Sequence, residues 1–129
     1  MTVLDASVII PAVSDDGADG TRCRRRLAGE AMDAPDLARI EVLSALRRHL
    51  LSGRLDPAGA QQAVEDMLAM PIDVHPTGPL LQRAWELRDT ITPYDACYVA
   101  LAESMGAVLL TADGRLARAR GPECRIEVI

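Results

Sequence analysis

Residues 93–113 read PYDACYVALAESMGAVLLTAD, and they hold the clearest signals of secondary structure in the chain. It predicts a helix from Pro93 to Met105, because a first-turn proline opens the helix and Gly106 supplies the C′ residue at which helices commonly end. A short apolar run from Val108 to Leu110 follows and predicts a buried strand. A helix that leads directly into a strand is the repeating unit of a parallel α/β sheet.

The same alternation extends over the rest of the chain. Further strands are predicted in four short apolar runs, at Val3 to Leu4, Met32 to Ala34, Ile72 to Val74 and Ile126 to Val128. Further helices are predicted after Pro35 up to Gly53, from Asp56 to about Met67, and from Leu80 to Arg88. This pattern favours a parallel sheet covered by helices on both faces. The Asp- and Gly-rich stretch from Ser14 to Gly20 is predicted to be a mobile loop.

Length and composition predict one domain that spans residues 1–129. The chain is 49% hydrophobic, which is enough to build a core without disulfides or a structural metal. Its three cysteines, Cys23, Cys97 and Cys124, form no CxxC pair and come without a signal peptide, so we expect a reducing cytoplasm. No apolar run approaches the roughly 20 residues of a membrane span, so we expect no membrane partner.

Four acidic residues occupy positions from which a folded α/β chain presents carboxylates to a shared pocket: Asp5, Glu41, Asp95 and Asp113. Asp5 ends the first predicted strand and Asp113 follows the strand from Val108 to Thr111, so both belong to the carboxyl rim of the sheet. Asp95 lies in the first turn of its helix and Glu41 in the second turn of another. We therefore expect all four to converge at that rim.

Like charges gather only where something offsets their repulsion. Two carboxylates about 4 Å apart repel by roughly 4 kcal/mol at an effective dielectric near 20, and a divalent cation turns this penalty into coordination. Oxygen ligands favour Mg²⁺, whereas His49 and His75 follow no zinc-ligand spacing. The four acids therefore predict metal-dependent phosphate chemistry, with Ser7 and Thr111 donating hydrogen bonds to the metal-binding carboxylates.

Each acid also has a purely structural explanation. Asp95 follows an N-cap threonine and a first-turn proline, where the helix dipole favours an acid, and Asp113 has the position of a helix N-cap. Asp5 could form a turn or cap hydrogen bond with Ser7, and Glu41 could be a solvated surface residue. The remaining candidate groups, Cys97, Trp85, Tyr94 and Tyr98, are predicted to be core or packing residues.

The net charge is −5, but it falls to only −1 without the four candidate ligands, so an RNA partner is not excluded. All 14 basic residues are arginine, and the absence of lysine excludes a P-loop. The densest basic group is Arg22, Arg24, Arg25 and Arg26. These arginines could contact phosphates, form a solvated helix face, or contact a partner protein.

Four stretches resemble, in order, the acidic motifs of PIN-domain ribonucleases, and more narrowly of the VapC toxins of bacterial type II toxin–antitoxin systems. They are VLDAS (3–7), ARIEVLSALRR (38–48), YDACYVALAE (94–103) and LTADGRL (110–116). The resemblance implies a Mg²⁺- or Mn²⁺-dependent endoribonuclease with an α/β/α sandwich and a five-stranded parallel sheet. It also implies a homodimer and a VapB-type antitoxin that blocks the acidic pocket.

These features together give one working hypothesis for the site. Asp5, Asp95 and Asp113 bind the metal directly or through water, Glu41 is a further ligand or a base that orients water, and RNA is hydrolysed without a covalent intermediate. Two alternatives are a receiver-type signalling domain, which lacks support because the chain has no lysine, and a catalytically silent module that binds RNA or a protein. The apolar helix from Leu37 to Leu51 could serve a dimer or an antitoxin groove as readily as the core.

Overall fold

The structure is a computed structural model that describes residues 1–129, and its centre is a single sheet of five parallel strands. The strands are β1 (Thr2–Leu4), β2 (Met32–Pro35), β3 (Ile72–His75), β4 (Val108–Thr111) and β5 (Ile126–Val128). All four strand pairs are parallel, in the order β3-β2-β1-β4-β5. Each strand coincides with a predicted apolar run, so the predicted α/β fold with a parallel sheet is confirmed.

The strand order reverses between β1 and β4. The chain first builds outward from β1 to β2 and β3, and then returns to the other side of β1 to add β4 and β5. Thr2 pairs with Val108 and Leu4 with Leu110, so the two central strands end level at the carboxyl edge. In open parallel sheets this reversal is where a crevice forms and ligands bind.

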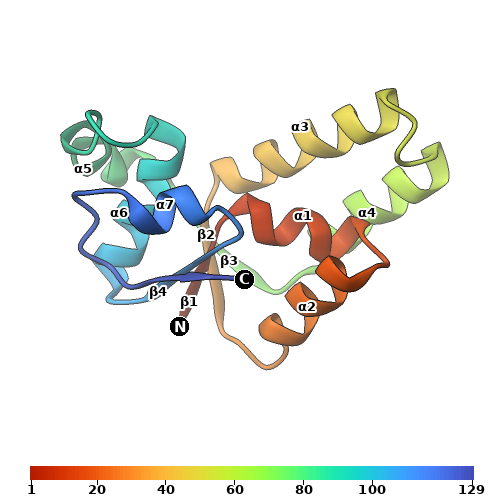
Figure 1. The fold of residues 1–129 in the computed structure, drawn as a ribbon, viewed down its shortest axis with the longest axis horizontal. Coiled ribbons are helices and arrows are strands. Elements are labelled where there is room, and N and C mark those ends of the chain that lie inside the picture. Colours follow the sequence, from red (N-terminus) through yellow and green to blue (C-terminus); the bar gives the residue numbers. More distant parts are fainter.

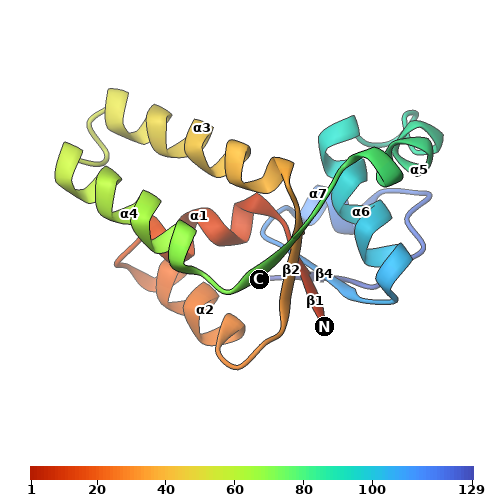
Figure 2. The ribbon, with the colours of Figure 1, turned by 180° about the vertical axis from the view of Figure 1, so that it is seen from behind.

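Helices cover both faces of the sheet. They are α1 (Ala6–Ser14), α2 (Ala18–Leu27), α3 (Leu37–Leu51), α4 (Pro57–Ala69), α5 (Leu81–Glu86), α6 (Pro93–Met105) and α7 (Gly114–Arg118), with a 3₁₀ turn at Gly78–Leu80. The helices α1 to α4 lie on one side of the sheet and α5 to α7 on the other (Figures 1 and 2). Right-handed crossovers require this separation, because the chain crosses the sheet in opposite directions in its two halves.

The core extends over both faces of the sheet, with β1 and β4 at its centre and α6 packed against them. Val3, Leu4, Leu109 and Leu110 are fully buried in the two central strands. Every residue from Ala96 to Ala102 is buried as well, and many of them are small, which lets the helix approach the sheet closely. Because α6 begins at the carboxyl edge, Asp95 in its first turn is held at the level of the strand ends.

Two helices were not predicted. Apolar β-branched residues and Pro11 give α1 little helical signature, and α2 is polar and rich in arginine. The prediction of a mobile loop from Ser14 to Gly20 is wrong in part, because α1 reaches Ser14 and α2 already begins at Ala18. Between them the Asp15 carboxylate accepts hydrogen bonds from the backbone N–H groups of Gly17 and Gly20.

The predicted packing roles hold for some residues and fail for others. Cys97 and Tyr98 are buried, as predicted. Trp85 and Tyr94 are 64% and 63% exposed, so the core role predicted for Trp85 and the packing role predicted for Tyr94 are wrong. On α3 the buried face consists mainly of small residues, whereas Ile40 and Leu51 are 67% and 69% exposed. The long apolar stripe of this helix therefore faces outward over much of its length.

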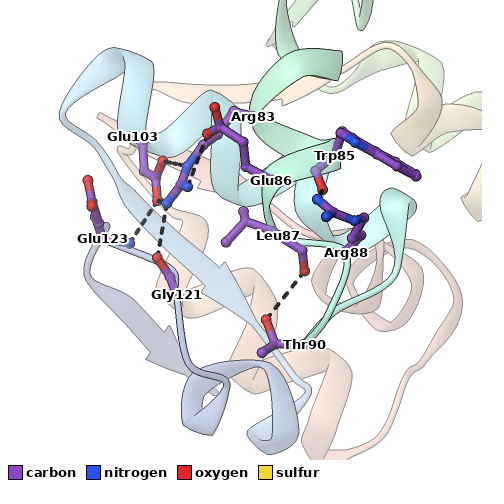
Figure 3. Close-up of polar contacts among 9 residues, drawn as sticks. All are labelled: Arg83, Trp85, Glu86, Leu87, Arg88, Thr90, Glu103, Gly121 and Glu123. Carbon is purple, nitrogen blue, oxygen red and sulfur yellow. Dashed lines mark hydrogen bonds and ion pairs between the residues drawn. The ribbon is translucent and has the colours of Figure 1, made fainter.

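The segment between α7 and β5 is fixed by an ionic cluster on α5 and α6 (Figure 3). Arg83 donates from Nε and Nη2 to the two carboxylate oxygens of Glu103, at 2.8 and 3.2 Å, and from Nη2 to the carbonyl of Gly121 at 2.9 Å. The backbone N–H of Glu123 donates to Glu103 Oε1 at 2.7 Å. Burial alone would raise the pKa of Glu103, but the hydrogen bonds from Arg83 and Glu123 lower it below its usual value.

None of the helices combines the length and the apolar character that crossing a membrane requires. The three cysteines are unpaired, with Cys23 and Cys97 buried and Cys124 half-buried.

Candidate active site

Asp5 lies at the reversal of the strand order and is fixed from two sides. It follows β1, is only 7% exposed, and its backbone N–H donates to the carbonyl of Leu110 on β4 at 3.0 Å. Its Oδ2 accepts hydrogen bonds from Ser7 Oγ at 2.8 Å and from Thr111 Oγ1 at 2.6 Å. Both bonds reach the same oxygen, so Oδ1 remains without a hydrogen-bond donor from the protein. A carboxylate with one anchored and one free oxygen is well suited to bind a cation.

Ser7 and Thr111 also hold the segment that carries Asp113. The backbone N–H of Ala112 donates to Ser7 Oγ at 2.9 Å, and that of Asp113 donates to Thr111 Oγ1 at 3.0 Å. The two hydroxyl oxygens are 3.3 Å apart. Ser7 and Thr111 thus make the predicted hydrogen bonds to a candidate ligand and also link the ends of β1 and β4.

Asp113 and Asp95 have the structural roles that were weighed against a ligand role. Asp113 is the N-cap of α7, and its Oδ1 accepts the backbone N–H of Arg115 at 2.9 Å. In α6 the N-cap is Thr92, whose hydroxyl accepts the N–H of Asp95 at 3.2 Å. These contacts leave oxygens of both carboxylates available, so capping does not exclude metal binding.

Glu41 reaches the same rim from α3, but it is not a freely solvated residue. It is half-buried, and its Oε1 accepts a hydrogen bond from the hydroxyl of Tyr98 at 2.5 Å. Tyr98 belongs to α6, on the opposite face of the sheet, and its side chain is fully buried. This contact could not be inferred from the sequence, because the two residues are 57 positions apart and a tyrosine in a helix is usually a packing residue.

All four predicted acids line one hollow of about 520 Å³, together with Ser7, Ser44, Arg48 and Arg115. Burial raises the pKa of Glu41, and the nearby carboxylates of Asp5 and Asp95 add to the rise. The pKa of Asp95 is raised in the same way by burial, Asp5 and Asp113. The mutual repulsion expected of gathered carboxylates is therefore present, and it is a frequent mark of functional sites.

The donor set of this hollow fits a hard divalent ion. No three Asp, Glu, His or Cys side chains stand close enough together to form a ready-made cage. Mg²⁺ does not need one, because it binds through one or two carboxylates and completes its shell with waters and substrate phosphate oxygens. The free Oδ1 of Asp5 provides an anchored oxygen ligand for such an ion.

Two further hollows adjoin the acidic one on either side. A hollow of about 510 Å³ shares Asp95, Asp113 and Arg115 with it and continues to Thr92, Thr90 and Arg88. Another, of about 530 Å³, shares Ser7 and Ile10 with it and contains Arg22, His49 and Arg54. Both flanking hollows contain arginine side chains, and both also contain acids, with Asp89 in the first and Asp15 and Asp19 in the second.

The four arginines of the dense basic group are not equivalent. Arg26 forms ion pairs with Glu30 at 2.7 Å and Glu127 at 2.9 Å, and Arg24 donates to the carbonyls of Ala12 and Asp15 at 3.1 and 2.8 Å. Arg22 lines the hollow beside Ser7, although it also pairs with Asp19 at 3.2 Å. Arg25 is exposed and makes no side-chain hydrogen bond or ion pair. RNA contact by this group stays a prediction, for which Arg22 and Arg25 have the accessible side chains.

Residues 2–122 match the family described as PIN domain. The chain is 38% identical to Ribonuclease VapC12 of Mycobacterium tuberculosis over 129 residues, which is 100% of this chain and 99% of that protein. It is 44% identical to Ribonuclease VapC3 of the same organism over 117 residues, covering 91% and 85% of the two chains.

A similar fold is found in the crystal structure of DNA-bound VapBC from Salmonella typhimurium. The TM-score is 0.70 at 21% identity, over 98% of this chain and 96% of that chain. The sheet order, the converging acids and the sequence matches all agree with one another. This chain belongs to the PIN-domain family and is a VapC-type member of it.

Proposed function

We propose that this protein is an endoribonuclease toxin, dependent on Mg²⁺ or Mn²⁺, that hydrolyses RNA phosphodiester bonds. The observation that carries the proposal is the convergence of Asp5, Glu41, Asp95 and Asp113 on one hollow at the reversal of the strand order. The ribonuclease names of the relatives at 38% and 44% identity supply the substrate class. We treat residues 1–129 as one PIN domain.

Asp5, Asp95 and Asp113 hold the ion directly or through water, and Glu41 is a further ligand or the base that orients the attacking water. When bound, the ion lowers the pKa of a water molecule and offsets the charge that develops on the phosphate. Ser7 and Thr111 hold the Asp5 carboxylate in its orientation by donating to Oδ2. Burial and the neighbouring carboxylates raise the pKa of Glu41 above its ordinary value, which favours a role as a base.

The flanking hollows give the RNA strand a path across the site. Arg48 and Arg115 line the acidic hollow itself, and Arg115 is 87% exposed with only a long 3.5 Å contact to Asp113. Arg88 extends this path on one side, where its guanidinium lies 4.6 Å from the ring centre of the exposed Trp85. These exposed arginines bind backbone phosphates of the RNA, whereas the acids, through the metal ion that they hold, determine which phosphate is cleaved.

A protein partner accounts for the apolar outer surface of α3 and α4. A groove of about 260 Å³ runs between these helices, lined by Leu43, Leu46, Leu50, Pro57, Ala60 and Val64. Leu46 and Ala60 form its buried floor, whereas Leu43, Leu50 and the nearby Leu68 are exposed, and a contiguous exposed apolar patch marks a protein contact. A VapB-type antitoxin covers the site in the resting cell, and the active form is a homodimer. The unpaired cysteines agree with function in the cytoplasm.

The test compares Asp5→Asn with Asp16→Asn on structured RNA, each with Mn²⁺ and with a chelator. Asp16 is exposed and makes no side-chain contact, so its variant controls for the loss of a charge. We expect wild type and Asp16→Asn to cleave only with metal, and Asp5→Asn to lose activity by a factor of about 10² or more. Cleavage by Asp5→Asn at the wild-type rate, or cleavage in the chelator, would reject the proposal and favour a catalytically silent module.

A further inference from the structure

Tyr98 is the only protein group that donates a hydrogen bond to Glu41. The donor hydroxyl lies 2.5 Å from Oε1, and the tyrosine side chain is fully buried in the core. The ring therefore cannot change its rotamer without disturbing the core. A rigid donor meets a side chain that has three rotatable bonds and would otherwise be free to move.

Tyr98 lies close to two of the four acids, Asp95 and Glu41, as well as in the core. Tyr98 follows Asp95 by three positions in α6, so the two side chains occupy the same helical face. Glu41 approaches from α3 on the other side of the sheet and faces the carboxylates of Asp5 and Asp95. Repulsion from these two groups drives Glu41 away from the hollow, whereas the bond to Tyr98 holds it at the rim.

The hydrogen bond from Tyr98 reaches only one of the two carboxylate oxygens of Glu41. Oε1 is engaged by the hydroxyl, and Oε2 receives no hydrogen bond from the protein. Asp5 shows the same division, because Ser7 and Thr111 both donate to Oδ2 and leave Oδ1 free. Two of the four acids are thus each held through one oxygen by buried or half-buried hydroxyls, with the second oxygen left for the hollow.

We propose that Tyr98 is a positioning residue that fixes Glu41 so that its Oε2 faces the bound divalent ion or the attacking water. This inference rests on the proposed metal-dependent function and adds a residue to it. Hydroxyl groups that orient metal-binding carboxylates commonly change metal affinity by a factor of 10 to 100 when they are removed. Tyr98 acts through Glu41 and does not itself touch the substrate.

The first experiment measures the dissociation constant for Mn²⁺ by calorimetry, without RNA, in wild type, Tyr98→Phe and Tyr94→Phe. Tyr94 lies one turn earlier in the same helix and is 63% exposed, so its variant is a matched control. We expect Tyr98→Phe to bind Mn²⁺ about 10-fold more weakly and Tyr94→Phe to bind as wild type does. Equal affinity in a folded Tyr98→Phe protein overturns the inference, while failure of wild type to bind Mn²⁺ overturns the proposed function together with it.

A double-mutant cycle separates positioning from a general loss of packing. In a Glu41→Ala background there is no carboxylate to position, so Tyr98→Phe should no longer change the affinity for Mn²⁺. A 10-fold effect that persists in this background would show that the hydroxyl acts on something other than Glu41, and would also overturn the inference.

A spectroscopic measurement keeps the test decisive should Tyr98→Phe fail to fold. The chain contains only two tyrosines, so wild type labelled with ¹³C at tyrosine Cζ gives two resonances, which the Tyr94→Phe spectrum assigns. We expect Mg²⁺ to shift the resonance of Tyr98 in a saturable titration that fits a single dissociation constant for Mg²⁺, and to leave that of Tyr94 in place. A Tyr98 resonance that does not move at saturating Mg²⁺ contradicts the inference.

Discussion

Thr111 Oγ1 lies 2.6 Å from Asp5 Oδ2, although the two residues are separated by 106 positions in the chain. Thr111 is completely buried at the end of β4, and Asp5 directly follows β1. The bond exists because β1 and β4 are neighbours at the reversal of the strand order and end level with each other. The pairing of β1 with β4 therefore places the Thr111 hydroxyl where it orients Asp5, a candidate metal ligand.

Replacing Thr111 by Val tests this connection with little change in side-chain volume. Asp5 would keep only the bond from Ser7, and the N–H of Asp113 would lose its acceptor. We expect Mn²⁺ affinity to fall about 10-fold and the free energy of unfolding to fall by about 1 to 2 kcal/mol. Calorimetry and urea denaturation measure the two effects. Thr77→Val, at a position without a side-chain hydrogen bond, should change neither.

The pH dependence of stability tests the crowding of the acids. Burial raises the pKa of Glu41 above the ordinary value of 4.5, so at neutral pH its ionised form costs stability. Without metal, Glu41→Gln should therefore melt at a higher temperature than wild type at pH 7.5. The difference should shrink as the pH falls through the raised pKa, and it should vanish below 4.5, where Glu41 is protonated in both states.

Divalent metal should reverse this order at neutral pH. Wild type gains roughly 2.7 kcal/mol when Mn²⁺ is present at a hundred times its dissociation constant, and the variant should gain less. Glu123→Gln, an exposed residue whose side chain makes no hydrogen bond, is the control at each pH. If Glu41→Gln melts below wild type at pH 7.5 in chelator, the acids do not repel one another as described.

The salt dependence of RNA binding tests the basic path. Binding of a single-stranded RNA is measured in chelator over a series of salt concentrations, so that no cleavage occurs. For single strands the slope of log affinity against log salt is about −0.7 per phosphate contact. Arg115→Ala should make the slope less steep by about 0.7. Arg125 lies at the opposite edge of the sheet, so the Arg125→Ala variant should have the wild-type slope. Identical slopes for all three proteins would remove Arg115 from the path.

Arg83→Ala should destabilise the protein without affecting the acidic hollow. The Glu103 carboxylate would lose its ion pair and the carbonyl of Gly121 its donor, at a cost of about 2 kcal/mol at neutral pH. Because the pKa of Glu103 is lowered in the folded state, the stabilisation is present above pH 4.5 and is lost as the pH falls through the lowered value. Arg22→Ala, which removes an exposed ion pair, should cost less than about 1 kcal/mol. Urea denaturation at pH 7 and pH 4 checks both expectations.

The sheet and the position of the acids could be predicted because they depend on local patterns. A short apolar run followed by an acid, such as Val3 to Asp5, predicts both a strand and the residue at which the strand ends. The contact between Tyr98 and Glu41 could not be predicted, because it joins two helices on opposite faces of the sheet. Trp85 was misplaced for a related reason: its size indicates the core, but α5 is short and Ala84 and Leu87 already occupy its inner side.

The basic group was the least predictable part of the sequence. Four arginines within five positions suggest a common role, but successive residues of a helix face different directions. Arg26 consequently turns to β5, Arg24 to the end of α1, and Arg22 to the hollow beside Ser7. The density of arginines in the sequence indicated that this segment is exposed. Only the geometry of the helix shows that its arginines contact three different parts of the molecule.

The wide separation of Asp5 from Thr111 and Asp113 along the chain has a consequence for synthesis. The hydroxyl that orients the Asp5 carboxylate is made 106 positions after it, and Asp113, the last of the four acids, is made later still. A nascent chain on the ribosome, or a product truncated before β4, therefore cannot assemble the site. Such fragments should be harmless to the cell that makes them.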